Sequence, residues 1–248
     1  MPWSGNQKVS SRAFERIVIE RIDMSQAGKH PVDMGAVEQS IPTLRLQPYL
    51  DLCNGDYVQG INFYLWNIEI SGAFWGSFNL LEVALRNSIH QQLIVKTGHP
   101  DWWAQPTMLR LNERLILEKV KEKFVEKGIE FEAGDLISEL GLGFWVALLS
   151  NKYHQALWVN SLENAFPGYS GRRNQLYMDL DRLRKLRNRI AHHEPIYRRE
   201  LSKDQESICE ILGYLNREAE KLLKNLSRVP NLIENKIPKI KGECEISF

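Results

Sequence analysis

Cysteine is scarce in this chain, with three residues among 248 that lie far apart in the sequence. Cys53, Cys209 and Cys244 form no closely spaced pair, so we expect neither a disulfide framework nor a structural zinc site. A low cysteine content is typical of proteins in a reducing compartment, and the sequence therefore predicts a cytoplasmic protein. We also expect no other metal and no cofactor.

Long apolar segments are absent as well. The longest apolar run, at residues 144–149, is far too short to cross a bilayer. Residues 1–20 carry charges throughout and lack the continuous apolar core that a signal peptide needs, so we expect no contact with a membrane. Apolar residues nevertheless make up 43% of the chain, which is enough for a buried core and excludes disorder of the whole chain.

The chain also has little net charge. Its formal value is +1, so any affinity for nucleic acid must come from the placement of charge and not from its total. Between Arg172 and Arg199 there are nine lysines and arginines against three acidic residues, a local excess of six. The sequence therefore predicts a basic patch in this segment.

Alternating apolar and polar residues, which would indicate β-strands, are nearly absent, whereas apolar residues recur at intervals of three and four. We therefore predict an all-α fold, a helical bundle. Residues 57–90 are expected to form two helices, or one helix kinked near Ser71 and Gly72, that end by Gly98. Further helices are expected at residues 107–127, 135–149, 153–166, 171–193 and 203–226.

Three regions follow from this pattern. Residues 1–45 are weakly patterned and predict an N-terminal arm or extension, residues 46–228 hold the helical domain, and residues 229–248 predict a loosely held C-terminal tail. Two apolar stripes are expected to be buried. They comprise Ile61, Tyr64, Leu65, Ile68, Ile70, Phe74, Phe78, Leu81, Leu85 and Ile89 in the first long helical segment, and Leu176, Leu180, Leu183, Leu186 and Ile190 in the later one.

The segment from Leu183 to Tyr197 combines a guanidinium, an amide and an imidazole close to Pro195, where the helix should end. Residues four apart share a helix face, so Arg184, Asn188 and His192 should form a row, with Arg187 one step round from Asn188. We expect the Asn188 amide to hydrogen-bond the His192 ring and so to select its tautomer.

These groups suit RNA cleavage without a metal. The ribose 2′-hydroxyl is the internal nucleophile, His192 would act as general acid or base, and Arg187 would bind the phosphate as charge builds on it. One imidazole serves only one side of the phosphate at a time, so a two-fold dimer would supply the second. An Arg-Asn pair and a single histidine are also common as surface or capping residues, so spacing alone leaves both interpretations open.

Four blocks carry a resemblance to a known family: Leu80–Ile89, Asp101–Trp103, Glu139–Trp145 and Leu186–Ile196. In order and spacing, over roughly residues 55–200, they are similar to the Abi-like (abortive infection) proteins, which carry the Arg-Asn-x-x-x-His motif of HEPN domains. The resemblance implies a HEPN-like bundle, to which we expect this chain to add N-terminal helices, and a homodimer that pairs two motifs across a cleft. It also implies a metal-independent endoribonuclease in phage defence, or a toxin held by an antitoxin or regulatory partner, with Arg187, Asn188 and His192 at the defining positions.

Other residues near the motif have two interpretations each. Arg86 and Asn87 lie in one of the four blocks and are candidates to line the cleft. The segment from Arg86 to His90 also resembles the motif with a shorter spacing. It is either a degenerate second half-site or, as we favour, a structural helix in which Arg86 pairs with Glu82. His193 is a second candidate base or a helix cap. Adjacent His192 and His193 diverge on a helix, which argues against a shared metal.

The remaining candidates concern RNA binding. Tyr197 would contact a base or ribose, or pack. Arg184, Arg189, Arg198 and Arg199 are expected to contact RNA phosphates. Tryptophans at positions 66, 75, 102, 103, 145 and 158 are assigned mainly to packing or to a dimer interface, although exposed ones can stack on bases. The alternative to a nuclease is a non-catalytic helical module that binds RNA or a protein.

Overall fold

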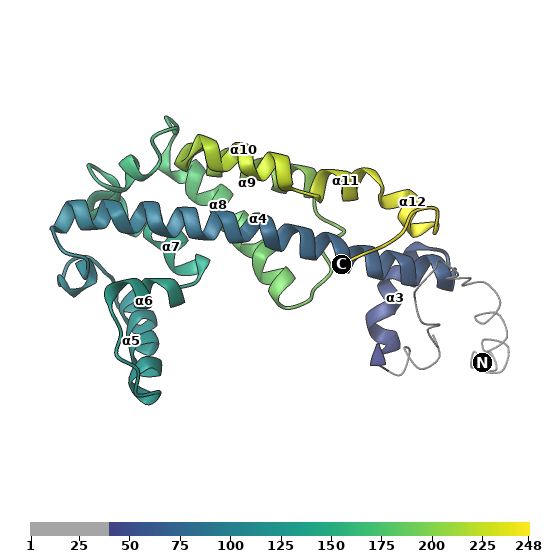
Figure 1. Ribbon diagram of the computed structural model, residues 1–248, viewed down its shortest axis with the longest axis horizontal. Coiled ribbons are helices and arrows are strands. Elements are labelled where there is room, and N and C mark those ends of the chain that lie inside the picture. The colour runs from purple at the N-terminus through teal and green to yellow at the C-terminus, as the bar shows by residue number, and fades with distance from the viewer. Residues whose placement is uncertain (1–39) are drawn as a thin grey trace, which may run out of the picture. The chain divides into compact units, whose positions relative to one another are not determined.

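The computed structural model describes residues 40–248, and within that range it contains helices and loops but no strand (Figure 1). The predicted all-α helical bundle is thereby confirmed. Most of the predicted N-terminal arm, at residues 1–45, lies outside the described residues. No helix in the described range is both long and apolar enough to span a bilayer.

The main helices are α3 (Thr43–Leu52), α4 (Tyr57–Thr97), α5 (Leu111–Glu126), α6 (Ala133–Glu139), α7 (Leu142–Leu148), α8 (Arg173–Ala191), α9 (Leu201–Leu215), α10 (Arg217–Leu226), α11 (Val229–Glu234) and α12 (Lys236–Ile240). Short 3₁₀ and π turns lie at Trp102–Ala104, Asn151–Tyr153, His154–Trp158 and Leu162–Ala165. The chain divides into two compact units. One holds the described residues up to Glu69 together with Asn235–Phe248, and the other holds Ile70–Glu234.

Helix α4 is the principal core element of the larger unit. The predicted stripe from Ile70 to Ile89 is confirmed, because Ile70, Phe74, Phe78, Leu81, Leu85 and Ile89 are all fully buried. The helix runs without interruption to Thr97 and stops before Gly98, so the prediction of two helices is wrong. Gly72 lies on the exposed side, where the burial of the opposite face outweighs its low helix propensity of about 1 kcal/mol relative to alanine.

The first part of α4 belongs to the smaller unit and confirms the predicted stripe only at Ile61, which is buried. Phe63 and Trp66 are buried, whereas Tyr64, Leu65 and Ile68 are only partly covered. Glu69 is also buried and forms an ion pair with Lys239 of α12 at 3.0 Å. A buried charged pair breaks the apolar period, which is why the pattern alone misplaced this face.

Residues 229–240 of the predicted C-terminal tail form helices α11 and α12 with buried side chains, whereas residues 241–248 are mostly exposed. Val229 and Leu232 of α11 are buried, as is Ile240 of α12. Lys236 places its ammonium 4.8 Å from the Phe63 ring centre, a cation–π contact that holds α12 on the first part of α4.

Three predicted helices are broken in the structure. The segment at 135–149 splits into α6 and α7 because Leu140 adopts an extended conformation and its carbonyl accepts a hydrogen bond from the Trp145 indole at 3.0 Å. Residues 153–166 form short turns around Asn160, which has a positive φ of 59°. The segment at 203–226 divides at Asn216, whose side chain accepts hydrogen bonds from two N–H groups at the start of α10.

The second apolar stripe is confirmed. Leu176, Leu180, Leu183, Leu186 and Ile190 of α8 are buried, and α8 packs against α7 and α9. Ser77 of α4 donates a hydrogen bond to Gln205 of α9 at 3.1 Å inside the core. The motif lies at the C-terminal end of α8, whose apolar stripe is buried and which packs against α7 and α9.

A buried carboxylate joins α5 to the turn that follows α7. Glu113 accepts hydrogen bonds from the Tyr153 hydroxyl at 2.6 Å and from the Lys152 ammonium at 2.7 Å. Burial alone would raise the pKa of Glu113, but these two donors lower it below its usual value of 4.5. The same burial, together with the bond to Glu113, raises the pKa of Tyr153.

Because the folded pKa of Glu113 is depressed, its stabilising effect is present above about pH 4.5 and is lost as pH falls through the lower folded value. We expect Glu113→Gln to reduce the free energy of unfolding at pH 7 by about 2 kcal/mol, the value of a buried hydrogen bond to a charge. The deficit should shrink between pH 5 and pH 3 in urea titrations, relative to exposed Glu118→Gln as the control. A deficit that is constant with pH would contradict this account.

Candidate functional site

The motif lies where α8 ends. The helix stops at Ala191, close to the predicted end, and the chain turns there with His193 in the left-handed conformation at φ 55°. The N–H of His193 bonds to the carbonyl of Ile190 at 3.0 Å, and the N–H of Glu194 bonds to that of Arg189 at 2.8 Å. This pair of bonds is a Schellman motif, a helix end that usually has glycine at the position of His193.

His192 is the C-cap of α8 and its side chain is exposed. Its N–H bonds to the Asn188 carbonyl at 3.0 Å, so the predicted row of Arg184, Asn188 and His192 keeps its four-residue spacing. The predicted hydrogen bond between the Asn188 amide and the His192 ring does not form within the described residues. In this structure Asn188 therefore does not select the tautomer of His192.

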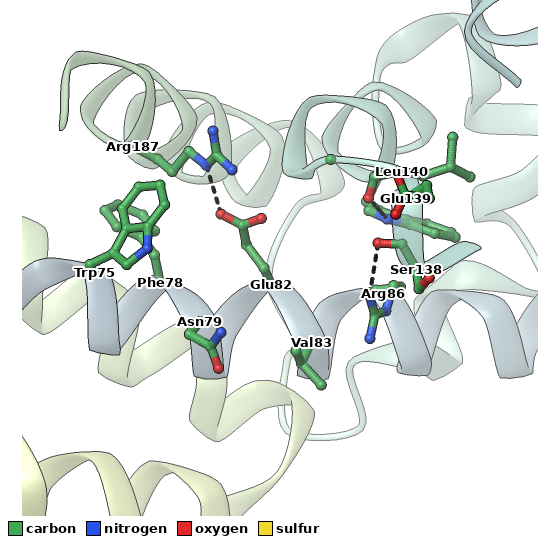
Figure 2. A pocket seen from close by; sticks show the side chains of 12 residues that line it. Trp75, Phe78, Asn79, Glu82, Val83, Arg86, Ser138, Glu139, Leu140 and Arg187 are labelled. Carbon is green, nitrogen blue, oxygen red and sulfur yellow. Dashed lines mark hydrogen bonds and ion pairs between the residues drawn. The ribbon is translucent and has the colours of Figure 1, made fainter. Parts of the chain in front are cut away.

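Arg187 points from α8 towards α4, as Figure 2 shows. Its Nε donates a hydrogen bond to Glu82 of α4 at 2.9 Å, and its guanidinium lies 5.0 Å from the centre of the Trp75 ring. Both terminal nitrogens of Arg187 lack a hydrogen-bond partner among residues 40–248. The carboxylate thus orients the guanidinium through Nε and leaves Nη1 and Nη2 available to an anion.

A pocket of 330 Å³ lies beside this ion pair. Its walls include Trp75, Glu82 and Arg86 of α4, Glu139 of α6 and Arg187 of α8 (Figure 2). Successive spacings of seven and four residues put the three α4 side chains on one helix face. Two arginines, Arg86 and Arg187, thus line the same pocket, although His192 does not.

Arg86 lines this pocket, in keeping with one of the two interpretations of its block. Its predicted pairing with Glu82 is wrong, because Glu82 bonds to Arg187. Instead, Arg86 donates from Nη1 to the Ser138 carbonyl and from Nε to the Asn87 amide oxygen, each at 3.4 Å. Asn87 is exposed and is not among the residues that line the pocket.

His90 has a structural environment, as the favoured interpretation of its segment predicts. The Trp102 indole donates a hydrogen bond to Nδ1 of His90 at 3.0 Å, and the Trp103 ring stacks beside it. Burial lowers the pKa of His90, which favours the neutral ring that can accept this bond. His90 is therefore explained by packing.

The predicted basic patch is partly neutralised. Arg184 pairs with Asp181 at 2.8 Å, and Arg199 makes two hydrogen bonds to the buried Asp204 at 2.8 and 2.9 Å. Two of the segment's arginines pair with carboxylates from outside it, Arg187 with Glu82 and Arg199 with Asp204. When these two acidic residues are counted, the local excess of positive charge falls from six to four.

The other candidate contacts with RNA lie just beyond the end of α8. Arg189 donates to the Pro195 carbonyl at 2.8 Å and lies 3.6 Å from the Glu194 carboxylate. Arg198 is exposed and lies 5.5 Å from the centre of the Tyr197 ring. Tyr197 itself is 9% exposed, so little of its ring is accessible to a base. Arg189 and Arg198 are both exposed and are therefore more accessible than Tyr197.

Sequence reasoning did not single out Glu82 and Trp75 as parts of the site. A helical projection could have found them, because they lie seven residues apart on the face of α4 that also bears Arg86. The pairing of Glu82 with Arg187 depends on tertiary packing and has no local signal. No three His, Cys, Asp or Glu side chains in the described range lie close enough to bind a metal ion together.

The left-handed conformation of His193 yields a test of the helix end. Both His193→Gly and His193→Ala remove the imidazole, but only glycine adopts a positive φ without steric cost. We expect the glycine variant to be more stable than the alanine variant by about 1 kcal/mol in urea denaturation. Equal stability, or a more stable alanine variant, would show that the left-handed turn is absent in solution.

Comparisons with known proteins assign no family to the chain. No protein-family model matches it, and no curated protein and no solved structure gives a match. The case for a function therefore depends on the residues and their geometry, above all on the pocket that α4 and α8 share.

Proposed function

We propose that this protein is a HEPN-type, metal-independent endoribonuclease that acts as a homodimer and cuts RNA through attack by the ribose 2′-hydroxyl. One observation supports this most strongly. The Arg187 guanidinium is held by Glu82 with its terminal nitrogens unpaired among the described residues, and the exposed His192 follows five residues later on the same helix end. An anion-binding group and a proton-transfer group are thus available from one element.

Arg187 would bind the scissile phosphate. Fixing Nε on Glu82 removes much of the rotational freedom of the side chain before RNA binds, so less entropy is lost when the phosphate arrives. The two terminal nitrogens can then donate in parallel to two phosphate oxygens as negative charge builds in the transition state. Trp75 restricts the guanidinium further through the cation–π contact.

His192 would transfer the proton. Histidine is the side chain whose charge changes most readily near neutral pH, and an exposed ring at a helix end can reach a bound strand. A second copy of the chain would supply the imidazole on the opposite side of the phosphate. The neighbouring His193 keeps a side chain where glycine is favoured, and backbone strain of this kind is common at functional sites.

The biological setting of the proposal comes from the resemblance of four sequence blocks to Abi-like proteins. It would place the activity in phage defence in the cytoplasm, or in a toxin that an antitoxin or another regulatory partner restrains. Asn188 belongs to the proposed motif, but its amide has no hydrogen-bond partner among residues 40–248. We infer that the Asn188 amide finds its partner only when RNA or the second copy binds.

The proposal predicts that His192→Ala abolishes cleavage of labelled RNA while circular dichroism and the mass of the assembly stay the same. Loss of general acid-base catalysis should reduce the rate by about 10²–10⁴-fold. Activity should persist in excess EDTA, and the products should end in 2′,3′-cyclic phosphate. His99→Ala, at an exposed histidine outside the motif, is the control. Undiminished cleavage by the His192 variant, or inhibition by the chelator, would refute the proposal.

Glu82 should act as a positioning residue through Arg187. Glu82→Gln retains an oxygen that can accept the Nε hydrogen bond, so we expect it to keep most of the activity, whereas Glu82→Ala should lose about 10²-fold in kcat. Because both side chains act as a unit, the double variant with Arg187→Ala should be no slower than Arg187→Ala alone. Additive losses would show that Glu82 does not work through Arg187.

A second candidate function is a non-catalytic module that binds RNA or a protein partner. The observation in its favour is that His192 does not line the pocket that contains Arg86 and Arg187. Such a module would bind RNA in a salt-dependent way without cutting it. Its binding would be unaffected by His192→Ala and lost on charge reversal at Arg184 and Arg198.

A further inference from the structure

Trp75 differs from the other tryptophans in the described part of the chain. Its side chain is 45% exposed, whereas those at positions 66, 102, 103, 145 and 158 are at most 8% exposed. A large aromatic ring in contact with water loses the stabilisation that burial would give it. Trp75 is therefore poorly explained by packing, which accounts for the other five.

The surface around Trp75 is open. Gly72 and Gly76 flank it on the exposed side of α4, and a methyl group added to either would meet nothing within 4 Å beyond the helix itself. The indole is turned towards Arg187, whose guanidinium lies 5.0 Å from the ring centre (Figure 2). Since neither glycine carries a side chain, a flat group can approach the ring without meeting one at these two positions.

The pocket next to Trp75 has the dimensions of a small-ligand site. Its 330 Å³ lies near the lower end of the roughly 300–1,000 Å³ typical of such sites, which suits one nucleotide and not a base-paired helix. A base inside a duplex is stacked on its neighbours and cannot reach an indole on the protein surface. An unpaired nucleotide can place its base there.

The charges of the pocket are balanced, which limits how a phosphate could bind. Arg86 and Arg187 carry the positive charges, and Glu82 and Glu139 carry the negative ones. Glu82 is already paired with Arg187, whereas Glu139 is exposed and would repel an anion. Binding would therefore depend on the directed N–H groups of the two arginines and on stacking, with little contribution from net charge.

We propose that this pocket binds one unpaired nucleotide of an RNA strand, with its base stacked on Trp75 and its phosphate between Arg86 and Arg187. That the strand is a substrate, cut at the flanking phosphate, rests on the ribonuclease function proposed above. Stacking tolerates every base, so the pocket selects unpaired RNA and imposes little sequence preference.

Fluorescence anisotropy tests this with the full chain in the His192→Ala background, so that the RNA stays intact. The probe is a labelled single-stranded oligonucleotide, compared with the same strand made of abasic nucleotides and with a duplex. Trp75→Ala should weaken binding of the intact strand by about tenfold or more, and Trp75→Tyr should restore it. On the abasic strand, Trp75→Ala should have a much smaller effect, limited to the loss of its contact with Arg187.

Matched variants separate stacking from charge. Arg86→Gln should weaken binding of intact and abasic strands alike, and Glu139→Gln should strengthen both, because each alters only the phosphate contact. Leu111→Ala, at an exposed apolar residue outside the pocket, is the control for Trp75→Ala. Circular dichroism establishes that each variant folds.

Three outcomes would overturn the pocket assignment. The first is an equal loss of affinity for the intact and the abasic strand in the Trp75→Ala variant. The second is a duplex that binds as tightly as the single strand. The third is a Trp75→Ala variant that forms a smaller assembly but keeps its RNA affinity, which would make Trp75 an interface residue. Failure of the ribonuclease proposal differs from all three. In that case the protein without the His192 substitution cuts no RNA, yet the stacking signature of Trp75 remains.

Discussion

The ion pair between Arg187 and Glu82 is the contact on which the candidate site depends. It joins the last turns of α8 to the middle of α4. The Arg187 guanidinium is thereby held in the wall of a pocket and does not extend into open solvent (Figure 2). At 28% and 24% side-chain exposure, both partners are partly shielded from water, so the attraction is stronger than that of a typical surface pair. Without the carboxylate, the arginine would be one more solvated cation on a basic helix.

The apolar core sets the geometry of that ion pair. Leu183 and Leu186 of α8 and Leu81 and Leu85 of α4 are fully buried, so neither helix can rotate without exposing its stripe. Glu82 follows directly after Leu81, and Arg187 follows directly after Leu186. Each polar residue thus lies at the edge of its helix's buried face. The hydrophobic effect supplies the energy that holds the two helices together, and Glu82 and Arg187 meet because the helices are aligned in this way.

Local patterns predicted the core well and the site only in part. The stripe from Leu176 to Ile190 and the end of α8 before Pro195 could be predicted because apolar period and proline geometry act within one helix. The break at Asn216 was missed because a single capping side chain outweighed a continuous apolar pattern. Glu82 was assigned to Arg86, its neighbour on the same helix, because nothing in the sequence indicates which face α8 would cover.

The pair of exposed glycines beside Trp75 has a consequence for how the site forms. Gly72 and Gly76 are each about 1 kcal/mol less favourable than alanine in a helix, so this stretch of α4 has a weak intrinsic preference for helical structure. Its conformation must be imposed by the residues packed on the opposite side, including Phe74 and Phe78. The wall that carries the indole therefore cannot be assembled ahead of the bundle: it becomes ordered in the same cooperative step that closes the core.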